Sequence, residues 1–414
     1  MSIDEPGLNR GLFARASGPQ SGPPGQKFVI ATTALVSTAS VLPSFLVGAM
    51  AIQIRGELGI TASGIGLAFA GFFCAGALAS APSGRLADRG DPRVIAAIAA
   101  IVSGLTSLVV AALVDSLPMV VACLAVAGVA NAVCQTAANL IIVRALPVRR
   151  QGFALAVKQS AIPGATLLAG LAVPTLAASA GWRWAFVLHA VLAFATAASI
   201  PRDRSAARRV PARDRVRPDV GAVARPRPDV PVWALVLLAA AAGLAGTAAS
   251  SLGSFLVSAA VEADVPESAA GLLLTASSIT GIAVRLIAGA RADRRGRGHF
   301  RVVSLMIGCG AFSFVLLAID APISYFLAAP LAFSTAWAWP GLFNLAIVRV
   351  NPSSPASATG ITQTGQFIGG VVGPLLFGIT AEHAGFRPAW LMASGIAAAG
   401  VTALLLAMAR IKAR

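Results

Sequence analysis

Two positively charged residues, Lys158 and Arg285, interrupt stretches of sequence that are otherwise apolar. Lys158 is one of three lysines in a chain with 29 arginines. A charge at the centre of a membrane-spanning helix costs at least about 2.5 to 3.5 kcal/mol on insertion scales, so an intramembrane cation indicates a functional site. All sixteen acidic residues fall in predicted loops, tails or helix ends. No buried carboxylate is therefore expected to pair with either cation, and both should attract a small anion such as a carboxylate.

Helical spacing places the two cations at one depth. Lys158 lies eight residues inward of Arg150, and Arg285 lies eight residues from Asp293. At about 1.5 Å per residue, both lie about 12 Å from the same membrane surface. Repulsion between charges about 8 Å apart would be about 2 kcal/mol at an effective dielectric of 20, and a shared anion would reverse its sign. Alternatively, each side chain could reach the headgroups or bond main-chain carbonyls on a neighbouring helix.

Uncharged amides accompany these cations. Asn131, Gln135 and Asn139 are spaced four residues apart, so they form one stripe along a helix. Gln159 follows Lys158 directly, and Gln363 occupies a similar place in the second half of the chain. We expect Asn131, Gln135, Gln159 and Gln363 to add hydrogen bonds to a bound anion. Hydrogen bonds between helices explain the Asn131 stripe about equally well.

The composition is that of a membrane protein. Hydrophobic residues make up 57% of the chain, charged residues 12%, and the mean hydropathy is +0.80. Helices satisfy their own backbone hydrogen bonds inside a bilayer, so apolar stretches of about 20 residues predict an all-α protein with twelve transmembrane helices. The predicted spans are 28–53, 63–86, 93–114, 118–143, 153–179, 184–200, 232–259, 268–290, 300–319, 323–348, 357–381 and 389–409.

An internal duplication divides these spans into two sets of six. The run 139–144 (NLIIVR) returns as 344–349 (NLAIVR), 205 positions later. A repeat of this length is typical of one half of a membrane carrier built around a central site. The duplication pairs Lys158 with Thr362 and Arg285 with Ser80. Each cation therefore has a neutral twin, which indicates that neither charge is required by the fold.

Charge and composition predict the organisation of the rest of the chain. Arginine and lysine gather in alternate loops, which predicts cytosolic termini by the positive-inside rule. The net charge of +16 is therefore expected to face lipid headgroups, not nucleic acid. The predicted segments are a cytosolic arm over 1–27, a six-helix bundle over 28–200, an Arg/Pro-rich linker over 201–231, a second bundle over 232–410 and a tail over 411–414.

Two short loops carry a family resemblance. The segment 84–90 (GRLADRG) with Arg93 resembles the signature loop of the major facilitator superfamily, and 289–297 (GARADRRGR) is a weaker echo of it. The resemblance implies a major facilitator fold, twelve helices as two pseudo-symmetric six-helix bundles, with a latch that closes the cytosolic side. The latch would comprise Gly84, Asp88, Arg89, Arg93, Gly289 and Asp293. The alternative is that these loops only fix the topology. Arg285, four residues before Gly289, is also placed as in monocarboxylate carriers of that family.

These features predict a secondary carrier that moves a small organic anion across a bacterial-type inner membrane by alternating access, as a monomer and without a cofactor or bound metal. The chain has no phosphate-binding loop, no metal-binding histidine cluster and no nucleophile with a suitable base, which argues against an enzyme. One alternative is a drug/proton antiporter of the same fold, although cationic drugs would favour a buried acid. Another is a membrane sensor that does not transport.

Overall fold

The computed structural model describes residues 24–177, 179–200, 229–294, 299–353 and 355–412, and this part of the chain is helical without a strand. Eleven helical segments in it are long and apolar enough to cross a membrane. The sixth predicted span corresponds to α8, whose 18 residues pack along α4 and α1. The helices are α1 (Pro24–Ala49), α2 (Ala51–Leu58), α3 (Ala62–Arg89), α4 (Pro92–Leu113), α5 (Leu117–Ala145), α6 (Val148–Gln159), α7 (Ala161–Ala172), the π-helix η1 (Val173–Ala177), α8 (Trp182–Ser199), α10 (Val232–Glu262), α11 (Glu267–Arg294), α12 (His299–Leu317), α13 (Pro322–Thr335), α14 (Pro340–Val350), α15 (Pro355–Ala384) and α16 (Phe386–Lys412).

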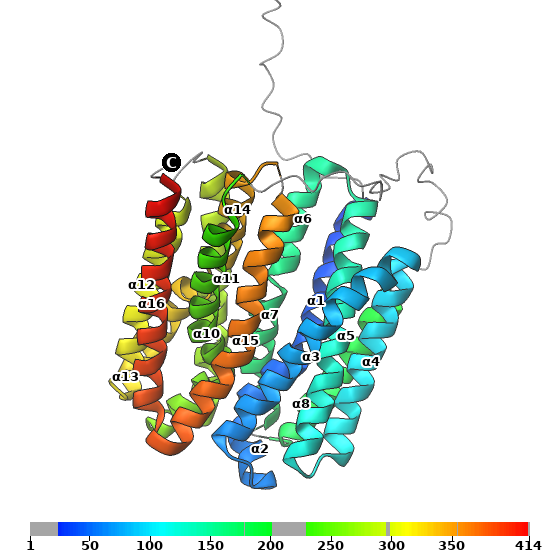
Figure 1. Ribbon diagram of the computed structural model, residues 1–414. Coiled ribbons are helices and arrows are strands. Elements are labelled where there is room, and N and C mark those ends of the chain that lie inside the picture. The colour runs from blue at the N-terminus through cyan, green and yellow to red at the C-terminus, as the bar shows by residue number, and fades with distance from the viewer. Residues whose placement is uncertain (1–23, 178, 201–228, 295–298, 354, 413–414) are drawn as a thin grey trace, which may run out of the picture.

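The helices form two bundles side by side, α1 to α8 and α10 to α16 (Figure 1). The bundles meet where α3 packs on α15 and where α7 packs on α11. Both described chain ends lie at one face of the molecule, which we call the terminal face and which is at the top of Figure 1. The other end, where α2 lies, is the opposite face. Helix α1 starts at Pro24, so residues 24–27 belong to it and not to the predicted arm; residues 1–23 and 201–228 lie outside the description.

Two of the spans are broken near prolines. The fifth span consists of α6 and α7, which join at Ser160 shortly before Pro163. The tenth span consists of α13 and α14, which are separated before Pro340. Proline has no backbone N–H and cannot bond the carbonyl four residues earlier, so it weakens the helix at that point. Both breaks thus coincide with a proline, whereas Pro374 lies inside the unbroken helix α15.

The two halves are pressed together towards the opposite face. A Cβ atom added at Gly66 of α3 would lie 2.3 Å from the carbonyl oxygen of Pro374 on α15. The side chain of Glu382 accepts a hydrogen bond from the Ser63 amide at 3.0 Å, and the Gln53 amide donates to Glu267 at 3.2 Å. These contacts join the halves at the opposite face, so this conformation is closed on that side.

Candidate functional site

The Lys158 side chain is buried near the end of α6. Only 4% of the residue is exposed, and its Nζ atom donates a hydrogen bond to Oδ1 of Asn139 on α5 at 3.0 Å. Within the described part of the chain, no carboxylate lies at ion-pair distance from this ammonium group. Lys158 is therefore a buried cation with a neutral partner.

Arg285, on α11 of the other half, reaches the residue next to Lys158. Its Nη1 atom donates to the main-chain oxygen of Gln159 at 3.1 Å, and its Nη2 atom donates to the main-chain oxygen of Trp337 at 2.5 Å. Its Nε–H has no acceptor among the described residues. Arg285 thus bonds the main chain of the residue that directly follows Lys158, and its arrangement is the alternative in which the guanidinium bonds main-chain carbonyls.

The stripe on α5 forms hydrogen bonds between helices. Oδ1 of Asn131 accepts from the buried hydroxyl of Ser40 on α1 at 2.9 Å and from Nε2 of Gln135 at 3.2 Å. Asn131 and Gln135 are both partly exposed. The stripe therefore ties α5 to α1, and it still presents polar surface to a solute.

Sequence reasoning overlooked Gln366. In the second half, Oδ1 of Asn344 accepts from Nε2 of Gln366 on α15 at 3.4 Å. Asn344 is the duplicate of Asn139. In each half this asparagine accepts a hydrogen bond from a residue of the following helix, Lys158 of α6 in the first half and Gln366 of α15 in the second. Gln366 lies three residues after the predicted site residue Gln363 on the same helix. Of the predicted glutamines, Gln363 is half-buried and Gln159 is exposed.

The predicted latch lies towards the terminal face, at the end of α3 and the end of α11. The side chains of Asp88, Arg89 and Asp293 lie outside the described residues. A Cβ atom added at Gly84 or Gly289 would meet nothing within 4 Å. In this conformation no close approach of another described helix is found at Gly84 or Gly289. The backbone amide of Arg93 bonds Asp91, which caps the start of α4.

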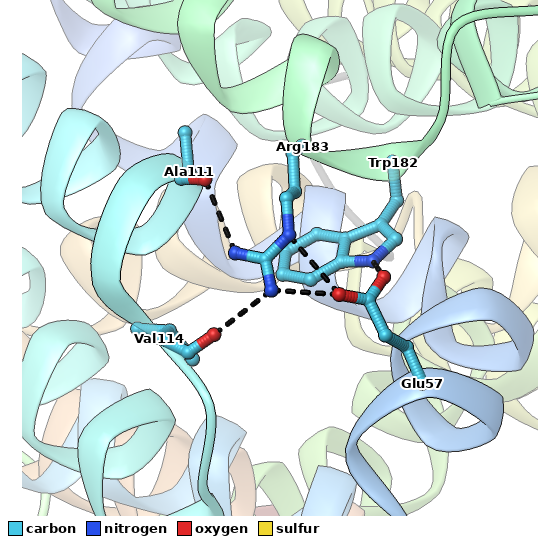
Figure 2. Close-up of polar contacts among 5 residues, drawn as sticks. All are labelled: Glu57, Ala111, Val114, Trp182 and Arg183. Carbon is cyan, nitrogen blue, oxygen red and sulfur yellow. Dashed lines mark hydrogen bonds and ion pairs between the residues drawn. The ribbon is translucent and has the colours of Figure 1, made fainter.

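A charged cluster at the opposite face joins three helices of the first half (Figure 2). Arg183 donates to the Glu57 carboxylate from Nε at 3.1 Å and from Nη2 at 2.7 Å, and Trp182 donates to it at 2.6 Å. Arg183 also donates to the main-chain oxygens of Ala111 and Val114 at 3.1 and 3.0 Å. The cluster fixes the ends of α2 and α4 to the start of α8, which explains an arginine on the face that has few cations.

Acid should weaken this cluster. The hydrogen bonds from Arg183 and then from Trp182 lower the pKa of the Glu57 carboxyl from its ordinary value of 4.5. A group whose pKa is lower in the folded state stabilises the fold above its unfolded pKa and loses that contribution as the pH falls through the folded value. We expect the unfolding temperature to fall below pH 4.5 more steeply in the wild type than in Glu57→Gln. The effect should be about 1 kcal/mol or less, because the Glu57 side chain is 48% exposed. Equal slopes in thermal melts of the two proteins would contradict it.

A membrane protein with two similar six-helix halves, joined at helix interfaces around buried polar residues, has the architecture of a secondary transporter. Residues 32–258 and 238–413 each match the sequence profile of the Major Facilitator Superfamily. The chain belongs to that family and is a transporter, not an enzyme.

Individual relatives are distant in sequence. The chain is 27% identical over 369 residues to the "Chloramphenicol resistance protein" of Streptomyces lividans, which covers 88% of this chain and 91% of the relative. A bacterial homologue of the human lysosomal transporter Spinster, in an inward-facing and occupied conformation, superposes with a TM-score of 0.72 at 16% identity over 94% of this chain and 98% of its own. The nucleoside transporter NupG gives 0.69 at 14% identity over 92% and 99%. These two structures share the fold.

Proposed function

We propose that the protein transports a small organic anion, a carboxylate, held by Lys158. The observation that carries this proposal is that the Lys158 ammonium is 4% exposed and bonded to the neutral amide of Asn139, with no carboxylate at ion-pair distance in the described residues. Burying a cation without a counter-charge is costly, and an anionic solute would supply that charge.

The neighbouring groups suit such a solute. An ammonium group has three N–H donors, and Asn139 accepts from one of them, so two are left for a carboxylate. Gln159, Gln363, Asn131 and Gln135 are at least partly exposed and would add neutral hydrogen bonds. Arg285 already donates to the main-chain oxygens of Gln159 and Trp337, so Lys158 is the cation that would contact the solute.

Transport would proceed by rocking the two halves about this site, which lies between α6, α5 and α11. We propose that the terminal face lies in the cytosol and that the protein is a monomer in an inner membrane; the gathering of arginine in alternate loops supports this orientation. This conformation, closed at the opposite face, would then be open towards the cytosol. Closing the cytosolic side would bring the loops at Gly84 and Gly289 together as a latch, with Asp88, Arg89, Arg93 and Asp293 contributing charge.

A thermal-shift screen tests the anion site. Acetate, pyruvate and succinate are added to the purified wild type, to Lys158→Thr and to Arg285→Ser. Each substitution introduces the residue type found at the duplicate position in the other half. We expect at least one carboxylate to raise the unfolding temperature of the wild type. In Lys158→Thr the same carboxylate should raise it much less. Losing a charged hydrogen bond of about 1.5 to 3 kcal/mol corresponds to a loss of affinity on the order of 10- to 150-fold. Equal shifts in wild type and Lys158→Thr would remove Lys158 from the site.

Drug export is the second candidate, favoured by the relative named for chloramphenicol resistance. Lys158 and the surrounding amides could also donate hydrogen bonds to an uncharged polar drug. Expression in a drug-sensitive host would distinguish the two functions. Resistance to chloramphenicol that persists in Lys158→Thr, together with no response to carboxylates, would favour drug export over anion transport.

A further inference from the structure

Prolines deprive two main-chain carbonyls in the first half of their helical donors. Pro43 lies inside α1, so the carbonyl of Ala39 has no N–H four residues later. Pro163 lies in the first turn of α7, so the carbonyl of Gln159 is deprived in the same way. No lipid group can replace a missing donor inside the hydrocarbon region, and an unbonded carbonyl there is costly.

The first of these carbonyls is satisfied within its own half. Nε2 of His189 lies 2.7 Å from the oxygen of Ala39, and Nδ1 lies 2.7 Å from the hydroxyl of Ser107. A carbonyl only accepts, so Nε2 carries the hydrogen that bonds the Ala39 oxygen, while Nδ1 forms the hydrogen bond with the Ser107 hydroxyl. His189 is thus structural, and the reason is the proline on α1.

The second carbonyl is satisfied from the other half. Arg285 donates to the Gln159 oxygen from Nη1 and to the Trp337 oxygen from Nη2. Trp337 lies in the break between α13 and α14, before Pro340. One guanidinium therefore bonds a carbonyl at a helix break in each half, as its planar fork of donors permits.

This contact ends a series of hydrogen bonds between α7 and α11. Thr275 donates to the Leu167 oxygen at 3.3 Å, and the hydroxyls of Thr166 and Ser278 lie 2.8 Å apart. The contact of Arg285 with Gln159 continues this series beyond the start of α7, at the end of α6. It is made to the last residue of α6, which directly follows Lys158, so it restrains the turn of helix that carries the Lys158 side chain.

We propose that Arg285 is a positioning residue, which acts through the Gln159 carbonyl to hold the end of α6 and so to aim the Lys158 ammonium. The role of Lys158 in binding an anion rests on the proposed function. The restraint on α6 does not, and the two are tested separately.

Pro163→Ala provides the decisive background, because it returns an N–H to the chain four residues after Gln159. The amide of Gly164 already bonds the Ser160 oxygen at 2.9 Å, so the restored N–H at 163 would point at the Gln159 carbonyl. Arg285→Gln should lower the unfolding temperature by on the order of 3 °C in the wild type. In Pro163→Ala the same change should lower it clearly less, because Gln159 then has a helical donor.

A position readout needs no substrate. In protein with the four native cysteines replaced by alanine, the maleimide labelling rate of Lys158→Cys should rise when Arg285→Gln is added and fall back when Pro163→Ala is added as well. Arg285→Lys has a single donor group, so its melting temperature and labelling rate should lie between those of the wild type and Arg285→Gln. It replaces Arg285→Gln in the experiment if that variant does not fold. Equal effects of Arg285→Gln in both backgrounds, on melting and on labelling, would overturn the proposal.

The substrate readout separates positioning from direct binding. If Arg285→Gln weakens the thermal shift given by acetate, pyruvate or succinate, adding Pro163→Ala should restore that shift. A shift that stays weak in the double variant would indicate a direct contact between Arg285 and the anion and would contradict the proposal. His189→Leu with Pro43→Ala is the matched control. Pro43→Ala should reduce the loss of melting temperature that His189→Leu causes, and neither change should alter the thermal shift given by the anion. If no carboxylate shifts the wild type, the proposed function fails, and melting and labelling still decide the role of Arg285.

Discussion

Gly66→Ala is expected to drive the protein out of the conformation described here. The added methyl carbon would lie 2.3 Å from the Pro374 oxygen on the other half, a distance that real Cβ contacts do not reach. The two helices, α3 and α15, must separate at the opposite face to admit it. Overpacking costs about 1 to 3 kcal/mol, so the population closed on that side should fall relative to the open one by on the order of 5- to 150-fold.

Thiol labelling measures this shift. Ser254 is fully buried, and its main-chain oxygen would lie 3.0 Å from a Cβ added at Gly48, so it lies where the halves meet. In protein without the native cysteines, Ser254→Cys should react with a membrane-impermeant maleimide at least several-fold faster when Gly66→Ala is present. Transport should fall because one state is disfavoured.

Gly308→Ala is the control, because a Cβ atom there meets nothing within 4 Å. It should change neither labelling nor transport. A labelling rate at Ser254→Cys that stays constant in Gly66→Ala would mean that the clash is relieved inside one half, and the interface at Gly66 would not report the state of the transporter.

The fold could be predicted from the sequence because its driving pattern is local. Long apolar runs predict helices wherever they occur, and the duplication of 139–144 at 344–349 divides them into halves. The described helices follow the predicted spans closely, and the breaks near Pro163 and Pro340 follow from the chemistry of proline. The family profile confirms the architecture that the loop at Gly84 implied.

The partners of the site residues were harder to predict, because they depend on packing between distant helices. Pro163 shows in sequence that the Gln159 carbonyl lacks a donor, but nothing in the sequence says that Arg285, 126 positions away, supplies one. The duplication of Asn139 as Asn344 likewise gives no sign that Asn139 is the hydrogen-bond partner of Lys158. A duplicated residue can therefore serve the fold in one half and orient a charge in the other.

Gly365→Ala should prevent the second half from assembling. A Cβ atom at Gly365 would lie 1.9 Å from the Ala239 oxygen on α10, and its next neighbours are also backbone atoms, so no side-chain rotation can relieve the clash. Cβ atoms added at Gly369 and Gly373 would lie 2.4 and 2.2 Å from atoms of α10, and the three glycines form one face of α15. Such packing is characteristic of membrane helices, where small residues allow backbones to approach.

Separating α15 from α10 would remove the contacts along this whole face, so we expect the loss of most monodisperse protein in size-exclusion chromatography after detergent extraction. Gly370→Ala is the matched control, because it faces Phe73 of the other half at 3.5 Å, an ordinary contact. It should purify and melt like the wild type. The two neighbouring substitutions differ only in which surface of α15 they change, so equal yields would show that α15 can move away from α10 at little cost. In that case the rigid halves that a rocking mechanism requires would not exist in this protein.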